Sequence, residues 1–246
     1  MPAILSVDLA YRQYRDIGVA VVTEGEARVL DLPLEGAPEV ERLADWLLHC
    51  ASEEQVVGLC IDGPLGWKGP APLAEHSRLS ERLVRAPGKT GLPPDGVKPR
   101  GYLGFTRFSI ALFERLTRDG DWQLPGAEAE GPTRAPSRSA FVTETFPTAI
   151  WRGLGLTPLV AKSKAGAGDV AAAVARFTGR TGLRLSGTPS HDQLQAVVGG
   201  YAGLRWAQGD PHAVLAGAPP IRLDGSWREG YIMTMQPSVP SHSTGQ

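Results

Sequence analysis

The stretch Val56–Gly66, with the sequence VVGLCIDGPLG, constrains the fold of this 246-residue chain more than any other. A short, largely apolar run leads into Asp62, and Gly63 and Pro64 then end any regular pairing. Such an abrupt end is typical of a strand buried on both faces, in a parallel or mixed sheet covered by helices. In open α/β sheets, ligands bind at the carboxyl ends of these strands. Asp62 therefore stands where a functional group is expected, although an aspartate before Gly-Pro also forms ordinary turns.

The residues on either side of this stretch predict a mixed sheet with a crossover helix. Ala3–Leu9 is apolar apart from two residues and predicts a buried strand. Ile17–Val22 and Ala27–Leu32 flank a glycine-containing turn and predict a hairpin. Apolar residues at helical spacing predict a helix over Pro38–Ala51. The order strand, hairpin, helix, strand is that of an α/β domain.

The second half of the chain alternates strands and helices less regularly. Phe141–Phe146 predicts a strand and Glu229–Met235 an edge strand. Helices are expected over 73–85, 104–118, from Pro147, after Lys162–Lys164 as far as Phe177, and over 190–206. Proline, glycine and small polar residues predict loops over 86–100 and 119–139. We therefore expect one domain over residues 1–235, with an irregular insertion at about 63–140 and a disordered tail over 236–246.

Composition indicates a globular protein with no membrane segment. Apolar residues make up 42% of the chain, but no apolar run approaches the roughly 20 residues of a membrane span. The amino terminus has no basic region and predicts a strand in place of a signal peptide. The only cysteines, Cys50 and Cys60, lie in apolar stretches and suggest reduced core residues of a cytoplasmic protein. The net charge of −1 argues against a long basic groove for duplex nucleic acid.

Four acidic residues stand at comparable places in the predicted elements. Asp8, Asp62 and Glu144 come late in strands, and Asp192 lies in the first turn of the last long helix. Carboxylates brought together repel one another unless a cation intervenes, and Mg²⁺ and Mn²⁺ favour oxygen ligands. The sequence has no zinc signature of the CxxC or HExxH type and no GxSxG elbow. The four acids therefore predict a Mg²⁺ or Mn²⁺ site, or else they serve as turn and helix-cap residues.

Several basic residues are candidates for binding a substrate phosphate. Arg78, Arg82 and Arg85 recur at helical spacing and predict a basic face, which is either a phosphate-binding surface or a solvated one. Arg12, Lys162 and Lys164 are further candidates, although exposed lysines and arginines are most often plain solvated charges. We single out Arg12, Arg78, Arg82, Lys162 and Lys164 as candidate substrate-binding residues.

Several motifs, taken in order, resemble the predicted nucleases called domain of unknown function 429, which have an RNase H-like fold. The motifs are ILSVDLA (4–10), CIDGPLG (60–66), ETFPTAIW (144–151), KSKAG (162–166), SHDQLQAVVGGYAG (190–203) and EGYIM (229–233). The resemblance implies a three-layer α/β fold, a central mixed sheet whose first three strands are antiparallel, with helices on both faces. It also implies that Asp8, Asp62, Glu144 and Asp192 occupy the acidic positions of an RNase H-like metal site. The family's arginine- and cysteine-bearing stretch is only loosely matched by His76–Arg85.

The leading functional hypothesis is metal-dependent hydrolysis of a phosphodiester bond in a nucleic acid or nucleotide. Asp8 and Asp62 would hold the metal most directly, Glu144 would help, and Asp192 would complete the site. One alternative is an ATP-dependent phosphotransferase of the actin and sugar-kinase type, but those enzymes pair two such domains and the chain has room for about one. The other alternative is a non-catalytic binding or scaffold protein that keeps the fold.

Overall fold

The computed structural model describes residues 1–70, 76–88, 90–91, 97–119, 121–127 and 140–237. Its strands are β1 (Ile4–Asp8), β2 (Gly18–Thr23), β3 (Glu26–Leu30), β4 (Gly58–Asp62), β5 (Trp122–Gln123), β6 (Ala140–Thr145), β7 (Arg184–Ser186), β8 (Ala213–Leu223) and β9 (Ser226–Met235). Its α-helices are α1 (Val40–Glu53), α2 (Leu79–Leu83), α3 (Leu103–Leu116), α4 (Pro147–Gly153), α5 (Ala167–Thr181) and α6 (His191–Ala207). Two 3₁₀ turns, η1 (Tyr14–Asp16) and η2 (Arg100–Tyr102), complete the described elements.

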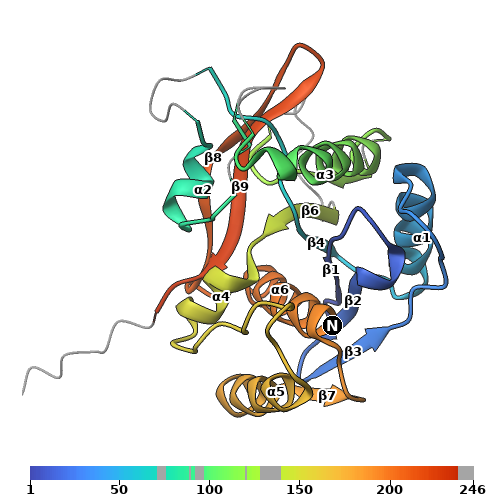
Figure 1. Cartoon of the computed structure of the whole chain (residues 1–246), viewed down its shortest axis with the longest axis vertical. Coiled ribbons are helices and arrows are strands. Elements are labelled where there is room, and N and C mark those ends of the chain that lie inside the picture. The colour runs from blue at the N-terminus through green and yellow to red at the C-terminus, as the bar shows by residue number, and fades with distance from the viewer. Residues whose placement is uncertain (71–75, 89, 92–96, 120, 128–139, 238–246) are drawn as a thin grey trace, which may run out of the picture.

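The strands, from β1 at residue 4 to β9 at residue 235, form one mixed sheet (Figure 1). Among the described residues the strand order is β7-β3-β2-β1-β4-β6-β9-β8, and β5 pairs with β6. The strands β1, β2 and β3 are antiparallel neighbours, while β4, β6 and β9 follow on the other side of β1 as parallel strands. This is the α/β sheet of an RNase H-like fold, with the antiparallel first three strands that the sequence resemblance implies.

Helices cover both faces of the sheet and bury two apolar layers (Figure 1). The helices α1 and α3 pack on the face that carries Leu5, Leu59 and Ile61. The helices α4, α5 and α6 pack on the opposite face, which carries Ile4 and Cys60. The alternation of these residues along β1 and β4 follows from the two-residue period of a strand, and it confirms that both strands are buried on both faces.

Small residues let α6 lie directly on the sheet. A Cβ atom on Gly203 would stand 2.4 Å from the Cys60 sulfur, and one on Gly200 would stand 2.6 Å from a Val22 methyl group. At the amino end of α6, Ser190 and Gln193 form the capping box that their spacing predicts. The helix therefore begins at a fixed point above the sheet, and Asp192 lies in its first turn.

The structure differs from the sequence prediction in four elements. The strand around Glu229–Met235 is not at an edge, because β8 forms a long hairpin with it and takes the edge position. The helix expected over 73–85 is reduced to α2, and residues 71–75 lie outside the described part of the chain. The helix expected after Lys162–Lys164 is α5, which begins at Ala167 and continues four residues beyond the expected end at Phe177, and β7 was not predicted. The predicted insertion contains α2, α3 and β5, and 128–139 and 238–246 also lie outside the described residues.

Candidate functional site

Asp8 and Asp62 lie side by side at one edge of the sheet. Both are the last residues of their strands, and they face each other in the parallel register of β1 and β4. Neighbouring parallel strands have their carboxyl ends at the same edge of the sheet. Because β1 and β4 are parallel neighbours, the two carboxyl groups at their ends lie together. Both side chains are half-buried.

Asp192 and His191 bring further ligand atoms to Asp8 from the first turn of α6. One ligand atom from each of Asp8, His191 and Asp192 lies within 4.8 Å of the others. Gly18 makes this approach possible, because a Cβ atom there would stand 2.2 Å from the Asp192 backbone. The register places Gly18 opposite Asp8 in β2, so the amino end of α6 rests beside the end of β1.

His191 is oriented by a backbone carbonyl. Its Nε2 lies 2.9 Å from the Val160 oxygen, and its Nδ1 lies 3.1 Å from an Asp192 oxygen. A carbonyl oxygen only accepts hydrogen bonds, so Nε2 carries a proton, and the Nδ1 that donates to the Asp192 carboxylate carries a second one, which a bound cation would displace. Metal-bound histidines commonly have their other nitrogen fixed in this manner. Sequence reasoning missed His191, and its position next to Asp192 in the capped first turn was the only signal.

The electrostatics of the site raise the pKa values of the two strand-end acids. Burial raises the pKa of Asp8 well above its usual value, and the nearby Asp62 and Asp192 charges raise it further. Burial and the Glu144 charge raise the pKa of Asp62 to about 7. Burial acts in the same direction on Asp192, but hydrogen bonds from His191 and Lys162 outweigh it and lower the pKa of that carboxyl. The hydrogen bond to Asp192 raises the pKa of His191.

This set of groups fits a divalent cation. Two adjacent carboxyl groups whose pKa values are raised by burial and by neighbouring acids are the arrangement expected where a cation would stabilise the ionised forms. A third carboxylate and an oriented imidazole stand within reach of the first. Both Mg²⁺ and Mn²⁺ bind oxygen-rich sites of this kind. The histidine nitrogen makes this set of ligands a better match for Mn²⁺ than for Mg²⁺.

Glu144 lies apart from this cluster. In the sheet Glu144 is paired with Ile61, whereas Asp62 is paired with Thr145. The Glu144 side chain therefore projects from the face of the sheet opposite to the face that carries the Asp62 side chain. Its two carboxylate oxygens each accept a hydrogen bond of 2.7 Å from the Arg78 guanidinium, and one also accepts the Leu65 N–H at 2.8 Å. The structure therefore brings Asp8, Asp62 and Asp192 together, and places Glu144 near enough to act on Asp62 through its charge alone.

Arg78 is a buried structural residue and not an exposed phosphate ligand. Its side chain has no exposed surface, and it donates to Glu144, Glu81, Thr90 and the Glu229 carbonyl. This differs from the basic face expected over 78–85. Because the helix comprises only Leu79–Leu83, Arg78 precedes it and turns inward, while Arg82 is exposed.

The other basic candidates lie at different distances from the acids. Lys162 donates hydrogen bonds to Asp192 and, at 2.9 Å, to Asp16, so it stands at the cluster. Arg12 is exposed and donates to the Tyr11 hydroxyl. Lys164 is exposed two residues beyond Lys162. Of the five predicted substrate-binding residues, the structure therefore places Lys162 in contact with Asp192 and Arg78 in contact with Glu144, and Lys162 is the one at the acidic cluster.

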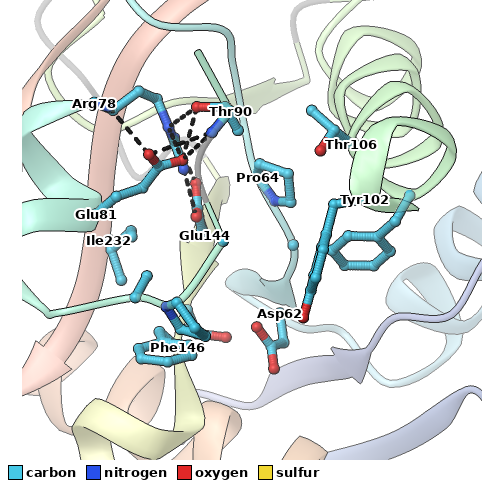
Figure 2. A pocket seen from close by; sticks show the side chains of 16 residues that line it. Asp62, Pro64, Arg78, Glu81, Thr90, Tyr102, Thr106, Glu144, Phe146 and Ile232 are labelled. Carbon is cyan, nitrogen blue, oxygen red and sulfur yellow. Dashed lines mark hydrogen bonds and ion pairs between the residues drawn. The ribbon is translucent and has the colours of Figure 1, made fainter. Parts of the chain in front are cut away.

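A cavity of about 240 Å³ opens beside Asp62 (Figure 2). Asp62 and Pro64 lie on one side of it, and Arg78 with Glu81 and Glu144 closes one end. Aromatic side chains form much of the remaining wall, namely Tyr102, Phe105 and Phe146. Asp62 is thus shared between the acidic cluster and the cavity.

Comparison with known proteins gives similarity at the level of solved structures. No family model and no curated protein matches the chain. A structure of T. thermophilus RuvC in complex with a Holliday junction substrate aligns with a TM-score of 0.42 and 11% identity, covering 85% of this chain and 98% of that one. A second Thermus thermophilus RuvC structure aligns with a TM-score of 0.40 and 13% identity, covering 85% and 97%. No helix among the described residues is long and apolar enough to cross a membrane.

Proposed function

We propose that this protein is a divalent-metal-dependent hydrolase of phosphodiester bonds, acting on a nucleic acid or nucleotide. The observation that carries the proposal is the convergence of Asp8 and Asp62 at the ends of adjacent parallel strands with Asp192 and His191 from α6. Such a set is useful for chemistry at a phosphate, because it concentrates hard ligands where the sheet ends and substrate has access.

In this proposal the residues of the cluster have distinct roles. Asp8 and Asp62 hold Mg²⁺ or Mn²⁺, and Asp192 with His191 completes the ligand set. When bound, the metal ion stabilises the charge on the attacking and leaving oxygens of a phosphoryl displacement. The charge of Glu144 acts on Asp62. Arg78 holds the Glu144 carboxylate in place through its hydrogen bonds. The roles of Asp8, Asp62 and Asp192 in holding metal follow the family pattern that the sequence resembles, whereas Glu144, which that pattern also assigns to the metal, would act from behind the cluster.

The protein's own groups also handle the proton and the substrate phosphate. Because the pKa values of Asp8 and Asp62 are raised, any proton that either carboxyl holds must leave before both can act as ligands. Asp192 accepts hydrogen bonds from Lys162 and His191, and it is placed to orient a water molecule beside Asp8. Lys162, held by Asp16 and Asp192, offers a positive charge to a phosphate at this edge, with Lys164 and Arg12 as further contacts.

We also infer that the chain belongs to the predicted nuclease family of domain of unknown function 429 and works in the cytoplasm. The six sequence motifs and the antiparallel first three strands support the family assignment. The free thiols of Cys50 and Cys60 support a reducing compartment.

Cleavage of labelled oligonucleotides tests the proposed function. Single-stranded, duplex and DNA–RNA hybrid substrates are incubated with Mg²⁺ or Mn²⁺, and we expect cleavage of at least one that EDTA abolishes. The Asp62→Asn and Asp8→Asn variants should lose most of this activity, whereas Asp210→Asn, on the loop after α6, should retain it. Activity that survives both EDTA and Asp62→Asn would exclude the mechanism. A saturable Mn²⁺ site without any turnover would favour the non-catalytic alternative.

A further inference from the structure

The cavity beside Asp62 has aromatic walls on two sides. Tyr102 and Phe105, from η2 and α3, line it, and Figure 2 shows Phe146 across the opening from Tyr102 with Asp62 below. The Tyr102 and Phe105 rings meet edge to face, with centroids 6.3 Å apart and planes at 77°. Tyr102 is 41% exposed, and Phe105 and Phe146 are half-buried. These rings are therefore partly open to the cavity and available to a flat ligand.

The charges around the cavity exclude an anionic group from its interior. Glu81 and Glu144 together carry two negative charges against the single positive charge of Arg78, and Arg78 already donates hydrogen bonds to both carboxylates. Asp62 adds a further acid at the side. A phosphate would be repelled from this interior, whereas a neutral planar group would gain contact with the rings.

The position of the cavity ties its occupant to the acidic cluster. Because Asp62 belongs to both, a ligand whose phosphate lies at Asp8 and Asp62 extends its next neutral portion directly into the cavity. In a nucleotide, the portion beside the phosphate that is neutral, flat and able to stack is the base. Aromatic side chains bind bases of any sequence through their faces.

We propose that this cavity binds one nucleobase, the base attached beside the phosphodiester that lies at Asp62. The inference rests on the proposed function and specifies its substrate. A base inside a duplex cannot reach such a cavity, so the substrate is a single strand, a strand end or a base turned out of its helix. The hydroxyl of Thr106, on the same wall, is placed to meet the edge of the base (Figure 2).

Binding of a fluorescent base analogue tests this inference separately from catalysis. A single-stranded oligonucleotide with one 2-aminopurine, moved position by position, is bound to the full chain with Ca²⁺ replacing the catalytic metal. We expect the 2-aminopurine signal to change at one position, and removal of the base there, leaving an abasic site, to weaken binding by about tenfold or more. The same strand in a duplex should bind more weakly. Competition by nucleoside monophosphate, but not by ribose phosphate, would identify a free nucleotide as the source of the base.

Side-chain variants assign the binding to the aromatic walls. Phe146→Leu and Phe105→Leu keep an apolar side chain but remove the ring, and each should weaken binding by about 10- to 100-fold. Phe108→Leu is the matched control, because Phe108 packs against the core from the same helix and does not line the cavity. Tyr102→Phe should bind like wild type. Thermal melts verify that every variant is folded.

The outcomes separate the two proposals. Normal binding by the Phe146→Leu and Phe105→Leu variants, tolerance of an abasic site at every position, or no binding of any strand would overturn the base site. If cleavage depends on Asp62 while these variants bind normally, the proposed function stands and the base site fails. If the variants lose binding but no substrate is cleaved with Mn²⁺, the base site stands and the proposed hydrolysis fails.

Discussion

At the scale of single residues, the proton on Asp62 links the acidic cluster to folding stability. The pKa of Asp62 is raised from 3.8 to about 7. Below about pH 4 this carboxyl is protonated in both the folded and the unfolded chain. Between about pH 4 and pH 7 the unfolded chain releases the proton while the folded chain keeps it, so the free energy of unfolding falls as pH rises. Above that window the loss is complete.

Asp62→Asn should therefore remove a pH-dependent penalty from the metal-free protein. Denaturant unfolding in EDTA at pH 5 and pH 8 should show a smaller fall in stability for the variant, which at pH 8 should equal wild type or exceed it by about 1–2 kcal/mol. The variant should also lose the thermal stabilisation by Mn²⁺ that wild type shows. This is the behaviour of a residue whose function costs stability.

Asp210→Asn provides a control of opposite sign. Burial raises the pKa of Asp210, but the hydrogen bonds from the His212 N–H and from Arg205 outweigh burial and lower this pKa. Its contribution to stability is therefore lost as pH falls through its folded pKa, and Mn²⁺ stabilisation should be unchanged in the variant. If Asp62→Asn instead destabilises the protein equally at both pH values and with or without Mn²⁺, Asp62 is an ordinary turn residue.

Sequence reasoning predicted the positions of the candidate acids correctly where backbone geometry alone decides which residues are neighbours. Asp8 and Asp62 could be predicted as neighbours, because two parallel strands of one sheet must end at one edge. The orientation of Glu144 could not, since a shift of one residue in register moves a side chain to the other face. Arg78 was assigned to a basic helix face, because the spacing of the arginines alone does not show that the helix begins at Leu79, the residue after Arg78.

At the scale of elements, the buried Arg78 fastens α2 to the sheet. It joins Glu81 in α2 to Glu144 in β6 and to the Glu229 carbonyl in β9. Arg78→Met leaves two carboxylates without their cation in a buried place, and we expect the free energy of unfolding to fall by about 3–5 kcal/mol in denaturant titrations. The added change Glu144→Gln should restore part of this loss, because it removes one of the unpaired charges.

Arg115 offers a matched comparison on the surface. It pairs with Glu41 and Asp45, whose side chains are largely exposed. Arg115→Met should therefore cost about 1 kcal/mol or less. Equal costs at Arg78 and Arg115 would contradict the structural role given to the buried network.

Gly18 controls how closely α6 approaches β2, and through this the position of Asp192. A Cβ atom at residue 18 would collide with the Asp192 backbone, which cannot yield as a flexible side chain can. Gly18→Ala should destabilise the protein by roughly 1–3 kcal/mol. It should also weaken Mn²⁺ binding about tenfold, because the first turn of α6 must move away from Asp8. Thermal melts with and without Mn²⁺ measure both effects.

Gly179→Ala, in α5, is the control for this change. No atom lies within 4 Å of the added Cβ position, so the alanine should stabilise the helix by about 0.5–1 kcal/mol and leave Mn²⁺ binding unaltered. Metal binding by Gly18→Ala at wild-type affinity would show that α6 does not position the cluster.

The strands that sequence reasoning missed show no clear strand pattern in the sequence. The strand β8 contains Gly217 and the pair Pro219 and Pro220, which are typical of loops and are tolerated here because β8 is an edge strand. The strand β7 has three residues, too few to show a period. By contrast, α1, α3 and α6 were predicted within two or three residues, because a long helix repeats its apolar spacing.

At the scale of the whole molecule, the sheet gathers its functional groups at one edge while the overall charge stays near neutral. The net charge is −1, so no strong field draws a nucleic acid to the surface as a whole. Binding should instead depend on the bound cation, the base cavity and the few basic residues near the cluster. This division predicts a weak dependence of affinity on monovalent salt.

If Arg12, Lys162 and Lys164 are the phosphate contacts, at most three counterions are released when a single strand binds. Each contact contributes about 0.7 to the slope of log affinity against log salt, so affinity should fall by about 20-fold or less between 50 and 200 mM KCl. Fluorescence anisotropy at a fixed divalent-ion concentration measures the slope. Lys164→Gln should reduce its magnitude by about 0.7, whereas Arg184→Gln, at the far edge strand β7, should leave it unchanged. A loss of about a thousandfold over the same range would instead indicate six or more phosphate contacts, and with them a binding surface much wider than the edge that carries Asp8 and Asp62.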